Sequence, residues 1–256
     1  MNPRGGYQPR HYRRLAQAEG LVSFGVTAGE SDLRIWAERQ LRAEAAAALQ
    51  AVRRQLIDYM RRHPEFAEAF EPLEPLAGAP EIVREMCDAA RAAGVGPMAA
   101  VAGAVAEAVG RALMARSREV IVENGGDIFM ATARERVVAV VAPGHKLSGR
   151  IGLTVPPAPE GLGVCTSSGR HGHSYSAGQA DAAVVVARSA ALADAVATAM
   201  GNRVQDEDDA AAAVEWALGV DGVIHALVIC GETVATAGRL EIVPIVVGED
   251  AGADGT

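Results

Sequence analysis

The chain has 256 residues, half of them apolar, and a formal net charge of −8. This length and composition allow a large buried core, formed as one domain or as two halves folded around each other. The basic residues gather in the first third of the chain and leave no basic stripe for a phosphate backbone, so nucleic acid is excluded as an expected partner. We predict a single domain over residues 1–256, with flexible ends at residues 1–14 and 249–256.

Cysteine usage and apolar runs indicate the compartment. Cys87, Cys165 and Cys230 lie far apart without CxxC spacing, which disfavours a disulfide framework or a thiolate metal site. The first twenty residues lack the apolar core of a secretion signal. The run Val95–Ala106 is broken by Glu107 and is shorter than the roughly 20 residues that cross a membrane. We therefore expect a cytoplasmic protein without a membrane partner, and we predict that this run is a buried helix.

The first elements in chain order are a hairpin and three helices. Two β-type runs in "LVSFGVTAGESDLRIWAE" flank "AGES" and predict the hairpin. Apolar residues then recur at helical spacing over Glu38–Arg62, and Pro64 marks the end of that helix. The proline-rich segment 64–80 is predicted to be a connector. Helices follow over Glu81–Ala93 and Pro97–Arg116, and the Ala/Gly face of the second suits close contact in a core or in a homodimer.

Short strands dominate from Glu119 onward. The predicted strands are "EVIVE", "DIFMATA", "RVVAVVAP", "RIGLTVP", "GVCTSS" and "ADAAVVVA". A helix over Ala190–Met200 follows, with Ser189 as its N-cap, and "DEDDAAAAVEWALG" begins with acidic residues that complement the helix dipole. The runs "GVIHALVIC", "ETVATAG" and "RLEIVPIVV" are predicted to form a meander. Because strands and helices come in blocks, the pattern favours an α+β fold over an alternating α/β sheet.

The segment "ENGGDI" contains the first candidate site residues. Gly125 and Gly126 permit positive φ and close approach of a ligand to the backbone. Asn124 and Asp127 have short side chains that can fix a hydroxyl, an amide or a cation. The alternative is a β-turn that only joins two strands.

The segment "CTSSGRHGHSYSAGQADA" contains the second set. Thr166, Ser167 and Ser168 precede Gly169 after an apolar strand, so hydroxyl and backbone N–H groups could donate to phosphate oxygens. Ser168 lacks the GxSxG context of a serine hydrolase nucleophile. The alternative is a flexible polar loop, with the preceding cysteine a small buried residue.

The same segment holds the one closely spaced histidine pair, His171 and His173. Imidazoles can donate to a phosphate, protonate a leaving group or accept a proton. We therefore predict that His171 and His173 are the catalytic residues of any reaction at this site.

Asp194 and Thr198 lie four residues apart, and therefore on one face, in an almost wholly apolar predicted helix. An Asp oxygen, a Thr hydroxyl, backbone carbonyls and ligand phosphates make a Mg²⁺ shell. In the structural alternative, Asp194 complements its own helix dipole and Thr198 bonds a backbone carbonyl.

The ordered set "ENGGDI", "CTSSG", a strand and "ADAVATAM" resembles the ApbE family, the FAD:protein FMN transferases, over roughly Pro97–Val204. The resemblance implies an α+β fold in which two packed α/β halves with antiparallel strands hold FAD and Mg²⁺ in a cleft. It also implies cleavage of the FAD pyrophosphate, with FMN passed to a threonine of an acceptor protein or, in some members, to water.

Carried over to this sequence, the resemblance assigns the metal ligands to Asp194 and Thr198. It matches the family's GGD turn and TSG segment to Gly125, Gly126, Asp127, Thr166, Ser167 and Gly169. The family's "HHIIDPxTG" stretch is replaced by "RHGHSYSAGQADA", in which His173 could substitute for one histidine while the Asp-Pro and Thr-Gly pairs have no counterpart. The pattern is most similar to a soluble branch of the family without that stretch.

Two functions remain open at this stage. The first is a protein that binds FAD or FMN and, with Mg²⁺, cleaves the FAD pyrophosphate or transfers FMN to an acceptor protein. The second is a non-catalytic binding module for a flavin or for another anionic small molecule, because a fold does not fix a function.

Overall fold

The computed structural model describes residues 18–168 and 178–245. Its helices are α1 (Arg42–Arg62), α2 (Glu65–Glu68), α3 (Glu81–Ala93), the 3-10 helix η2 (Pro97–Ala100), α4 (Val101–Met114), α5 (Ala190–Asn202) and α6 (Asp209–Leu218). Its strands are β1 (Val22–Ala28), β2 (Ser31–Ala37), β3 (Val120–Asn124), β4 (Asp127–Thr132), β5 (Arg136–Ala139), β6 (Ile151–Val155), β7 (Ala158–Ser167), β8 (Ala182–Ala187), β9 (Val223–Cys230), β10 (Thr233–Gly238) and β11 (Glu241–Pro244).

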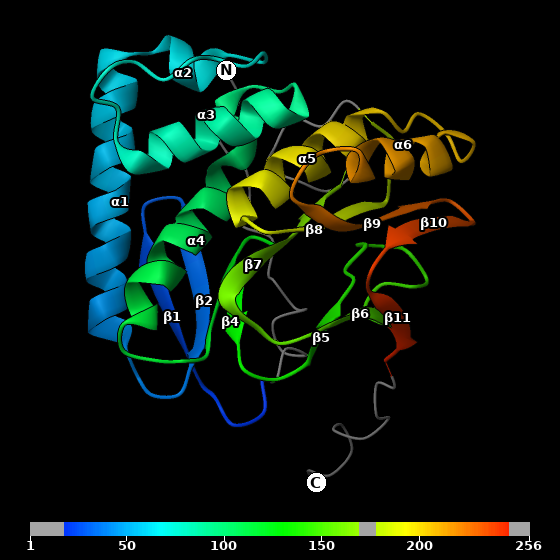
Figure 1. Ribbon diagram of the computed structural model, residues 1–256, viewed down its shortest axis with the longest axis horizontal. Coiled ribbons are helices and arrows are strands. Elements are labelled where there is room, and N and C mark those ends of the chain that lie inside the picture. The colour runs from blue at the N-terminus through cyan, green and yellow to red at the C-terminus, as the bar shows by residue number, and fades with distance from the viewer. Residues whose placement is uncertain (1–17, 169–177, 246–256) are drawn as a thin grey trace, which may run out of the picture.

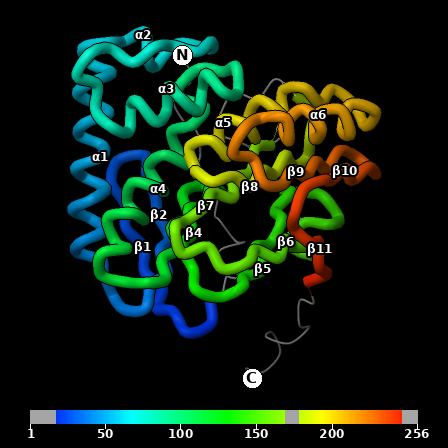
Figure 2. Tube along the Cα trace, in the orientation of Figure 1, coloured from blue at the N-terminus to red at the C-terminus, as the bar shows by residue number. Residues whose placement is uncertain are grey.

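The strands form two antiparallel sheets. The large sheet has the order β1-β2-β3-β4-β7-β8-β9-β10, and the small sheet has the order β11-β6-β5. Helices α4, α5 and α6 lie over the large sheet, α3 packs against α5 and η2, and α1 runs along the β1 end of the sheet (Figures 1 and 2). The predicted α+β class with antiparallel strands is confirmed.

Two apolar cores separate three layers. The larger core lies between the helices and one face of the large sheet, and the smaller core lies between its other face and the small sheet. Strand β8 is buried on both faces, because Val185 belongs to the larger core while Val184 and Val186 belong to the smaller. Side chains alternate between the faces of a strand, so the unbroken apolar run at β8 follows from its place between two cores.

The predicted meander at the end of the chain is wrong in its last strand. Strands β9 and β10 form a hairpin, but β11 pairs with β6, with Ile242 opposite Leu153. Ile242 packs on the smaller core, whereas β10 is an edge strand with alternating partial exposure. Burial against the small sheet therefore decides the partner of β11, and a local apolar pattern does not specify it.

The connector and the start of the next helix also differ from prediction in detail. Residues 65–68 form the short helix α2, because Phe66 is buried and its ring packs edge-on against Tyr59 with ring centres 5.2 Å apart. The helix predicted from Pro97 begins as the 3-10 turn η2 before α4.

Helix α4 is the buried helix that the sequence predicted. The segment Pro97–Met114 is long and apolar enough to cross a membrane by length and composition alone, but 56% of it is buried inside the fold. Its Ala/Gly face contacts the chain itself. A Cβ placed on Gly103 would lie 2.1 Å from the carbonyl oxygen of Ala190, so α4 and α5 cross in backbone contact.

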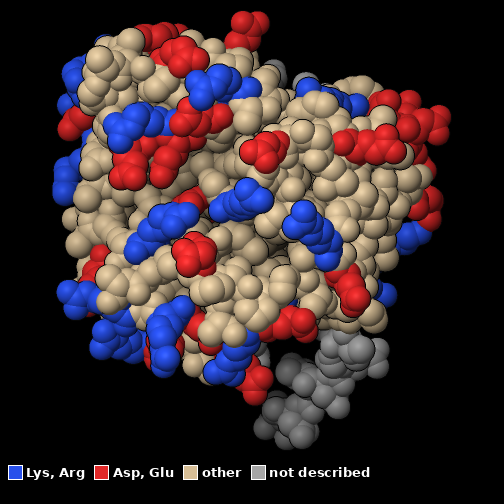
Figure 3. Space-filling model, in the orientation of Figure 1, with Lys and Arg blue, Asp and Glu red and all other residues tan. Residues whose placement is uncertain are grey.

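The surface carries both signs of charge. Figure 3 shows basic and acidic side chains interspersed over one face, with acidic side chains gathered near the start of α6. There Asp206, Glu207 and Asp208 are exposed at the start of the helix, where negative charge complements the helix dipole.

Candidate functional site

The "ENGGDI" segment forms the β3–β4 hairpin turn. Asn124 pairs with Asp127, and Gly125 and Gly126 adopt φ of 73° and 112°. The Gly126 N–H donates to the Glu123 carboxylate at 2.9 Å. The segment is thus a β-turn, and its two glycines occupy conformations that other residues rarely adopt.

The polar side chains of this turn reach other elements. The Asn124 amide donates to the carbonyl oxygen of Ala102 in α4 at 3.1 Å. Asp127 accepts the N–H of Thr166, near the end of β7, at 3.3 Å. The turn therefore joins the first turn of α4 to the strand end that carries the second candidate motif.

Asp194 reaches the same place from α5. Its carboxylate accepts the N–H of Gly103 at 2.9 Å, and it also accepts the N–H of Ala102. These are among the first N–H groups of α4, which its own N-cap residue, Ala100, leaves without a side-chain acceptor. Asp194 therefore caps α4. The alternative in which Asp194 serves its own helix is wrong, because the carboxylate bonds to the neighbouring one.

We call Asp127 and Asp194 the carboxylate pair. The pKa of Asp194 lies well above its usual value because burial disfavours the charged form and because the Asp127 charge repels it. The two N–H donors of α4 lower that pKa, and their effect is the smaller one. Within residues 18–168 and 178–245, no basic side chain forms an ion pair with Asp194.

Cys165 lies beside the carboxylate pair. Burial raises the pKa of its thiol well above the usual value, and the charges of Asp127 and Asp194 raise it further. The thiol is fully buried and donates to the carbonyl oxygen of Ala190 at 3.4 Å. It stays protonated and packs as a small apolar side chain, which is the role that the alternative interpretation of this segment gave it.

The hydroxyl residues close the site on the β7 side. Thr166 and Ser167 still pair with β8, opposite Val184 and Ala183. Within the part of the chain that the structure describes, the Ser168 hydroxyl is buried and has no hydrogen-bond partner. A buried hydroxyl without a partner is costly, so this oxygen suits a ligand that bonds to it.

Three predicted site residues, Gly169, His171 and His173, lie outside the described residues. Their placement in the site stays a prediction. The structure brings together Asn124, Asp127, Thr166 and Asp194 from four elements, and the predicted metal ligand Thr198 lies buried one helical turn beyond Asp194.

The donor set fits Mg²⁺. The carboxylate pair and the Thr198 hydroxyl offer hard oxygen atoms, and a carboxylate that accepts two N–H bonds keeps further lone pairs free. In the part of the chain that the structure describes, no group of three or more His, Cys, Asp or Glu could hold a metal ion. Such a group is typical of an all-protein cage, whereas Mg²⁺ is usually held by one or two carboxylates together with water and substrate phosphates.

Glu107 is a buried polar residue of the same region that the motifs did not single out. One of its oxygens accepts the Ser189 hydroxyl at 2.9 Å and the Ala190 N–H at 2.6 Å, at the start of α5. The other accepts Arg111 at 2.6 Å. The available signal was a carboxylate that interrupts an apolar run, which is the same signal that singled out Asp194.

Two hollows lie away from the carboxylate pair. One, of about 450 Å³, is lined by Glu38, Arg39 and residues 114–118. The other, of about 540 Å³, lies around residues 218–224. The candidate site residues do not line either hollow, so the predicted ligand cleft stays a prediction.

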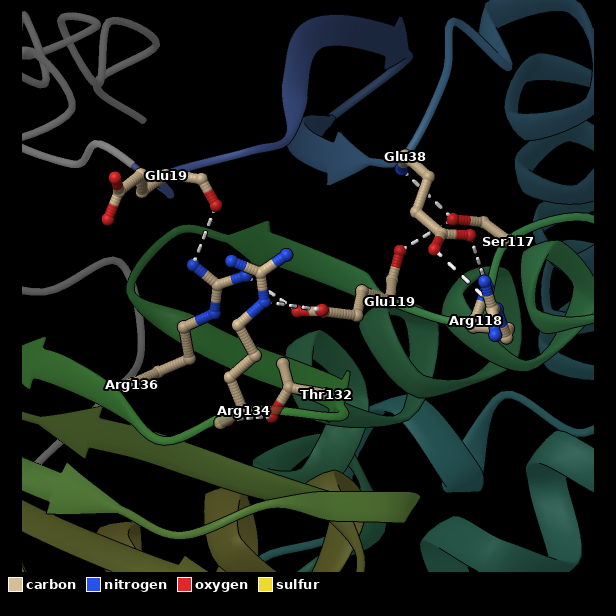
Figure 4. Close-up of polar contacts among 8 residues, drawn as sticks. All are labelled: Glu19, Glu38, Ser117, Arg118, Glu119, Thr132, Arg134 and Arg136. Atoms are coloured by element: carbon tan, nitrogen blue, oxygen red, sulfur yellow. Dashed lines mark hydrogen bonds and ion pairs between the residues drawn. The ribbon is translucent and has the colours of Figure 1, made fainter.

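The smaller hollow adjoins a polar network (Figure 4). The Ser117 hydroxyl accepts the Glu38 N–H at 3.0 Å and donates to the Glu119 carbonyl oxygen at 2.6 Å. The buried Glu119 carboxylate pairs with Arg134 at 3.3 Å and Arg136 at 2.6 Å. These contacts fix the loop between α4 and β3, which is a structural role.

The fold defines the class of this protein. The flavin transferase ApbE of Vibrio cholerae superposes with a TM-score of 0.56 at 13% identity, over 88% of this chain and 96% of that one. The flavinyl transferase ApbE of Pseudomonas stutzeri gives 0.55 at 16%, over 85% and 94%. At these identities the likeness establishes the fold alone.

Sequence comparison gives the family. A family model described as "AbpE bacteria" matches residues 13–221. The UPF0280 protein of Methanopyrus kandleri is 45% identical over 228 residues, which cover 86% of this chain and 91% of that protein. The UPF0280 protein of Methanocella arvoryzae is 43% identical over 190 residues, covering 74% and 77%. The chain therefore belongs to the AbpE bacteria family, and the resemblance to ApbE is confirmed.

Proposed function

We propose that this protein binds a flavin nucleotide, FAD or FMN, together with Mg²⁺, and that it cleaves the FAD pyrophosphate or transfers FMN to an acceptor. The carboxylate pair carries the proposal, and the ApbE fold supports it. Asp194 and Thr198 would hold the cation, with Asp127 facing it. When bound, Mg²⁺ supplies positive charge against the phosphates of the ligand.

The carboxylate pair favours a bound cation for an electrostatic reason. Two carboxylates that repel each other in a desolvated place destabilise the fold unless a proton or a cation compensates them. Here burial raises the pKa of Asp194, and the repulsion by Asp127 raises it further. An adjacent divalent cation removes both the repulsion and the desolvation cost, because it supplies opposite charge at short range.

Two further features suit a phosphate-containing ligand. Among the described residues, the Ser168 hydroxyl is buried and unpartnered directly after β7. A Cβ placed on Gly126 would have no atom of the described residues within 4 Å, so a ligand would have room to approach the backbone of the turn. His173, or His171, would transfer the proton of the reaction.

One observation favours a second function. The Asp-Pro and Thr-Gly pairs that follow the TSG segment in ApbE transferases have no counterpart in "RHGHSYSAGQADA". The second candidate is therefore a non-catalytic module that binds a flavin or another anionic small molecule at the same carboxylate pair.

Incubation of the purified protein with FAD, with Mg²⁺ or with EDTA, separates the two functions. Catalysis predicts that chromatography resolves FMN and AMP as products in the Mg²⁺ arm only. His173→Ala should then lower the chemical step by roughly 100-fold and leave FAD affinity nearly unchanged. Mg²⁺-dependent FAD binding without products supports the binding module. A melting temperature that does not respond to Mg²⁺ or FAD rules out the flavin in both functions and leaves only a module for another anionic molecule.

A matched pair of glycine variants tests the place of the ligand. Gly126 and Gly78 both have positive φ and open space around an added Cβ, but Gly78 lies in the connector before α3. Valine at either position introduces backbone strain of about 1–3 kcal/mol. Only Gly126→Val should also weaken FAD binding, and equal FAD affinity in both variants would make the motif a turn alone.

A further inference from the structure

A second hollow lies at the opposite end of β8 from the carboxylate pair. Ser167 is paired with Ala183 near the start of that strand, whereas Arg188 follows its end. Five residues of strand span roughly 17 Å. This hollow, of about 540 Å³, is in the range of small-molecule sites and is separate from the candidate flavin site.

Two arginines line this hollow. Arg188 comes from the end of β8 and Arg239 from the link between β10 and β11. Both are exposed, and neither guanidinium makes a hydrogen bond or an ion pair within the described part of the chain. Asp221 is the one acidic residue among the described lining residues, so the lining carries net positive charge.

The backbone of the same hollow is fixed and offers donors. The backbone N–H of Arg188 donates to the carbonyl oxygen of Gly222 at 3.0 Å, and that of Arg239 donates to the carbonyl oxygen of Ile224 at 3.2 Å. Both arginines are therefore held in place at their backbones. Gly222 has φ of 91°, and no intramolecular acceptor is found for the N–H groups of Asp221 and Gly222 in the regions that the structure describes. Successive free N–H groups at a turn suit an anion.

The rest of the lining is apolar. Its partly buried members are Leu218, Val220, Val223, Ile224 and Leu240. Arginine is suited to planar, two-pronged contact with carboxylates and phosphates. An anionic group beside the arginines would therefore leave the remainder of a ligand against an apolar wall.

We propose that this hollow binds a small organic anion, in which a phosphate or carboxylate group is joined to an apolar skeleton. Arg188 and Arg239 bind the anionic group, and the apolar residues contact the skeleton. The proposal does not depend on flavin binding, because it uses none of the residues around the carboxylate pair.

Calorimetric titration of the full chain with phenyl phosphate and benzoate tests the proposal. We expect one of them to bind, and we expect phenol and inorganic phosphate to bind at least tenfold more weakly. Arg188→Gln and Arg239→Gln should each weaken binding by roughly tenfold, since a hydrogen bond to a charged group contributes that much. Arg150→Gln is the matched control, because Arg150 is an exposed arginine before β6, at the other end of that strand from Pro156 in the lining.

The outcomes are distinct from those for the flavin site. Saturation with FAD and Mg²⁺ should leave phenyl phosphate binding unchanged, and Asp194→Asn should do the same. Competition by FAD, equal affinity in the double arginine variant, or no binding of either organic anion at millimolar concentration would overturn the proposal. Unfolding midpoints of the glutamine variants should match the parent, because neither guanidinium bonds within the described fold.

Discussion

Each of the helices α4 and α5 provides a carboxylate that accepts hydrogen bonds from the N-terminus of the other helix. Glu107 of α4 accepts the Ala190 N–H at the start of α5, and Asp194 of α5 accepts the Gly103 N–H at the start of α4. Each carboxylate satisfies N–H groups that have no partner within their own helix and complements the positive end of the dipole. The two ends of this helix pair thus have the same structural device.

The two ends differ in charge balance. Glu107 is paired with Arg111 at 2.6 Å, so its charge is compensated. Asp194 faces Asp127, a second carboxylate, and its pKa is raised by burial first and by the Asp127 charge second. Capping a helix requires one acceptor and no second carboxylate beside it. The approach of Asp127 to Asp194 is therefore the feature that a bound cation would explain, and the Glu107 end is its structural counterpart.

The largest expected effect on stability is at the Glu107 end, where the carboxylate is paired with Arg111. Glu107→Ala removes the acceptor of Ser189, Ala190 and Arg111, and it leaves buried donors without partners. We expect a loss of about 3 kcal/mol in the free energy of unfolding. Chemical denaturation should show the same loss with EDTA and with Mg²⁺ plus FAD. A loss that disappears when Mg²⁺ and FAD are added would place Glu107 in the ligand site and end the contrast.

The next largest effect is expected at the Asp194 end, where two carboxylates face each other. In the parent, Mg²⁺ plus FAD at about 100 times the dissociation constant should add about 2.7 kcal/mol of stability. Asp194→Asn keeps the size of the side chain but removes the charge, so this added stability should vanish. Without metal, the weaker cap and the lost repulsion by Asp127 oppose each other, and stability should change by less than about 1 kcal/mol.

Asp209→Asn is the matched control for that variant. Asp209 is also a carboxylate near a helix start: it lies in the first turn of α6, accepts the N–H of Gln205 in the preceding loop at 2.8 Å, and is away from the carboxylate pair. It should lose a few tenths of a kcal/mol and keep the full response to Mg²⁺ and FAD. Equal metal responses in parent and Asp194→Asn would leave Asp194 as a cap only.

Local patterns predicted most elements. Helix α3 spans Glu81–Ala93 as predicted, and Ser189 caps α5 by accepting the Leu192 N–H, also as predicted. The turn at Gly125 and Gly126 has the positive φ that its residues suggested. These features depend on residues close in sequence, so spacing and residue type are sufficient to find them.

Long-range partners could not be predicted in this way. The apolar pattern of β11 fits any open strand edge, and only the assembled second core selects β6. The motifs singled out Asp194 but not the helix that it caps, because that contact joins residues 91 positions apart. Glu107 was missed as a partner of α5 for the same reason.

A smaller effect is the pH dependence of metal binding. Because the pKa of Asp194 is raised above its usual value of 3.8 in the folded state, the folded state holds its proton to higher pH than the unfolded state does. Stability without metal should therefore fall as pH rises from 3.8 through the raised pKa. Mg²⁺ competes with that proton, so its affinity should rise over the same range, by up to about tenfold or 1.4 kcal/mol per pH unit.

Melting curves recorded with EDTA and with Mg²⁺ at about five pH values between about pH 4 and pH 8 measure how stability without metal and Mg²⁺ affinity change with pH. In Asp194→Asn the two curves should run parallel, because the titrating group is gone. A Mg²⁺ response that stays constant with pH in the parent would mean that the cation does not compete with a proton on Asp194.

The smallest effect is expected from two hydroxyl residues of α5, Ser189 at the Glu107 end and Thr198 near Asp194. Ser189→Ala removes the N-cap of α5 and its bond to Glu107, and it should cost about 1 kcal/mol with or without metal. Thr198→Val keeps the shape of a buried side chain one turn beyond Asp194, and it should mainly weaken the Mg²⁺ response. If Ser189→Ala weakened the Mg²⁺ response as much as Thr198→Val does, the Glu107 end and the Asp194 end would form one coupled site. The difference between their carboxylates would then not mark the place of the cation.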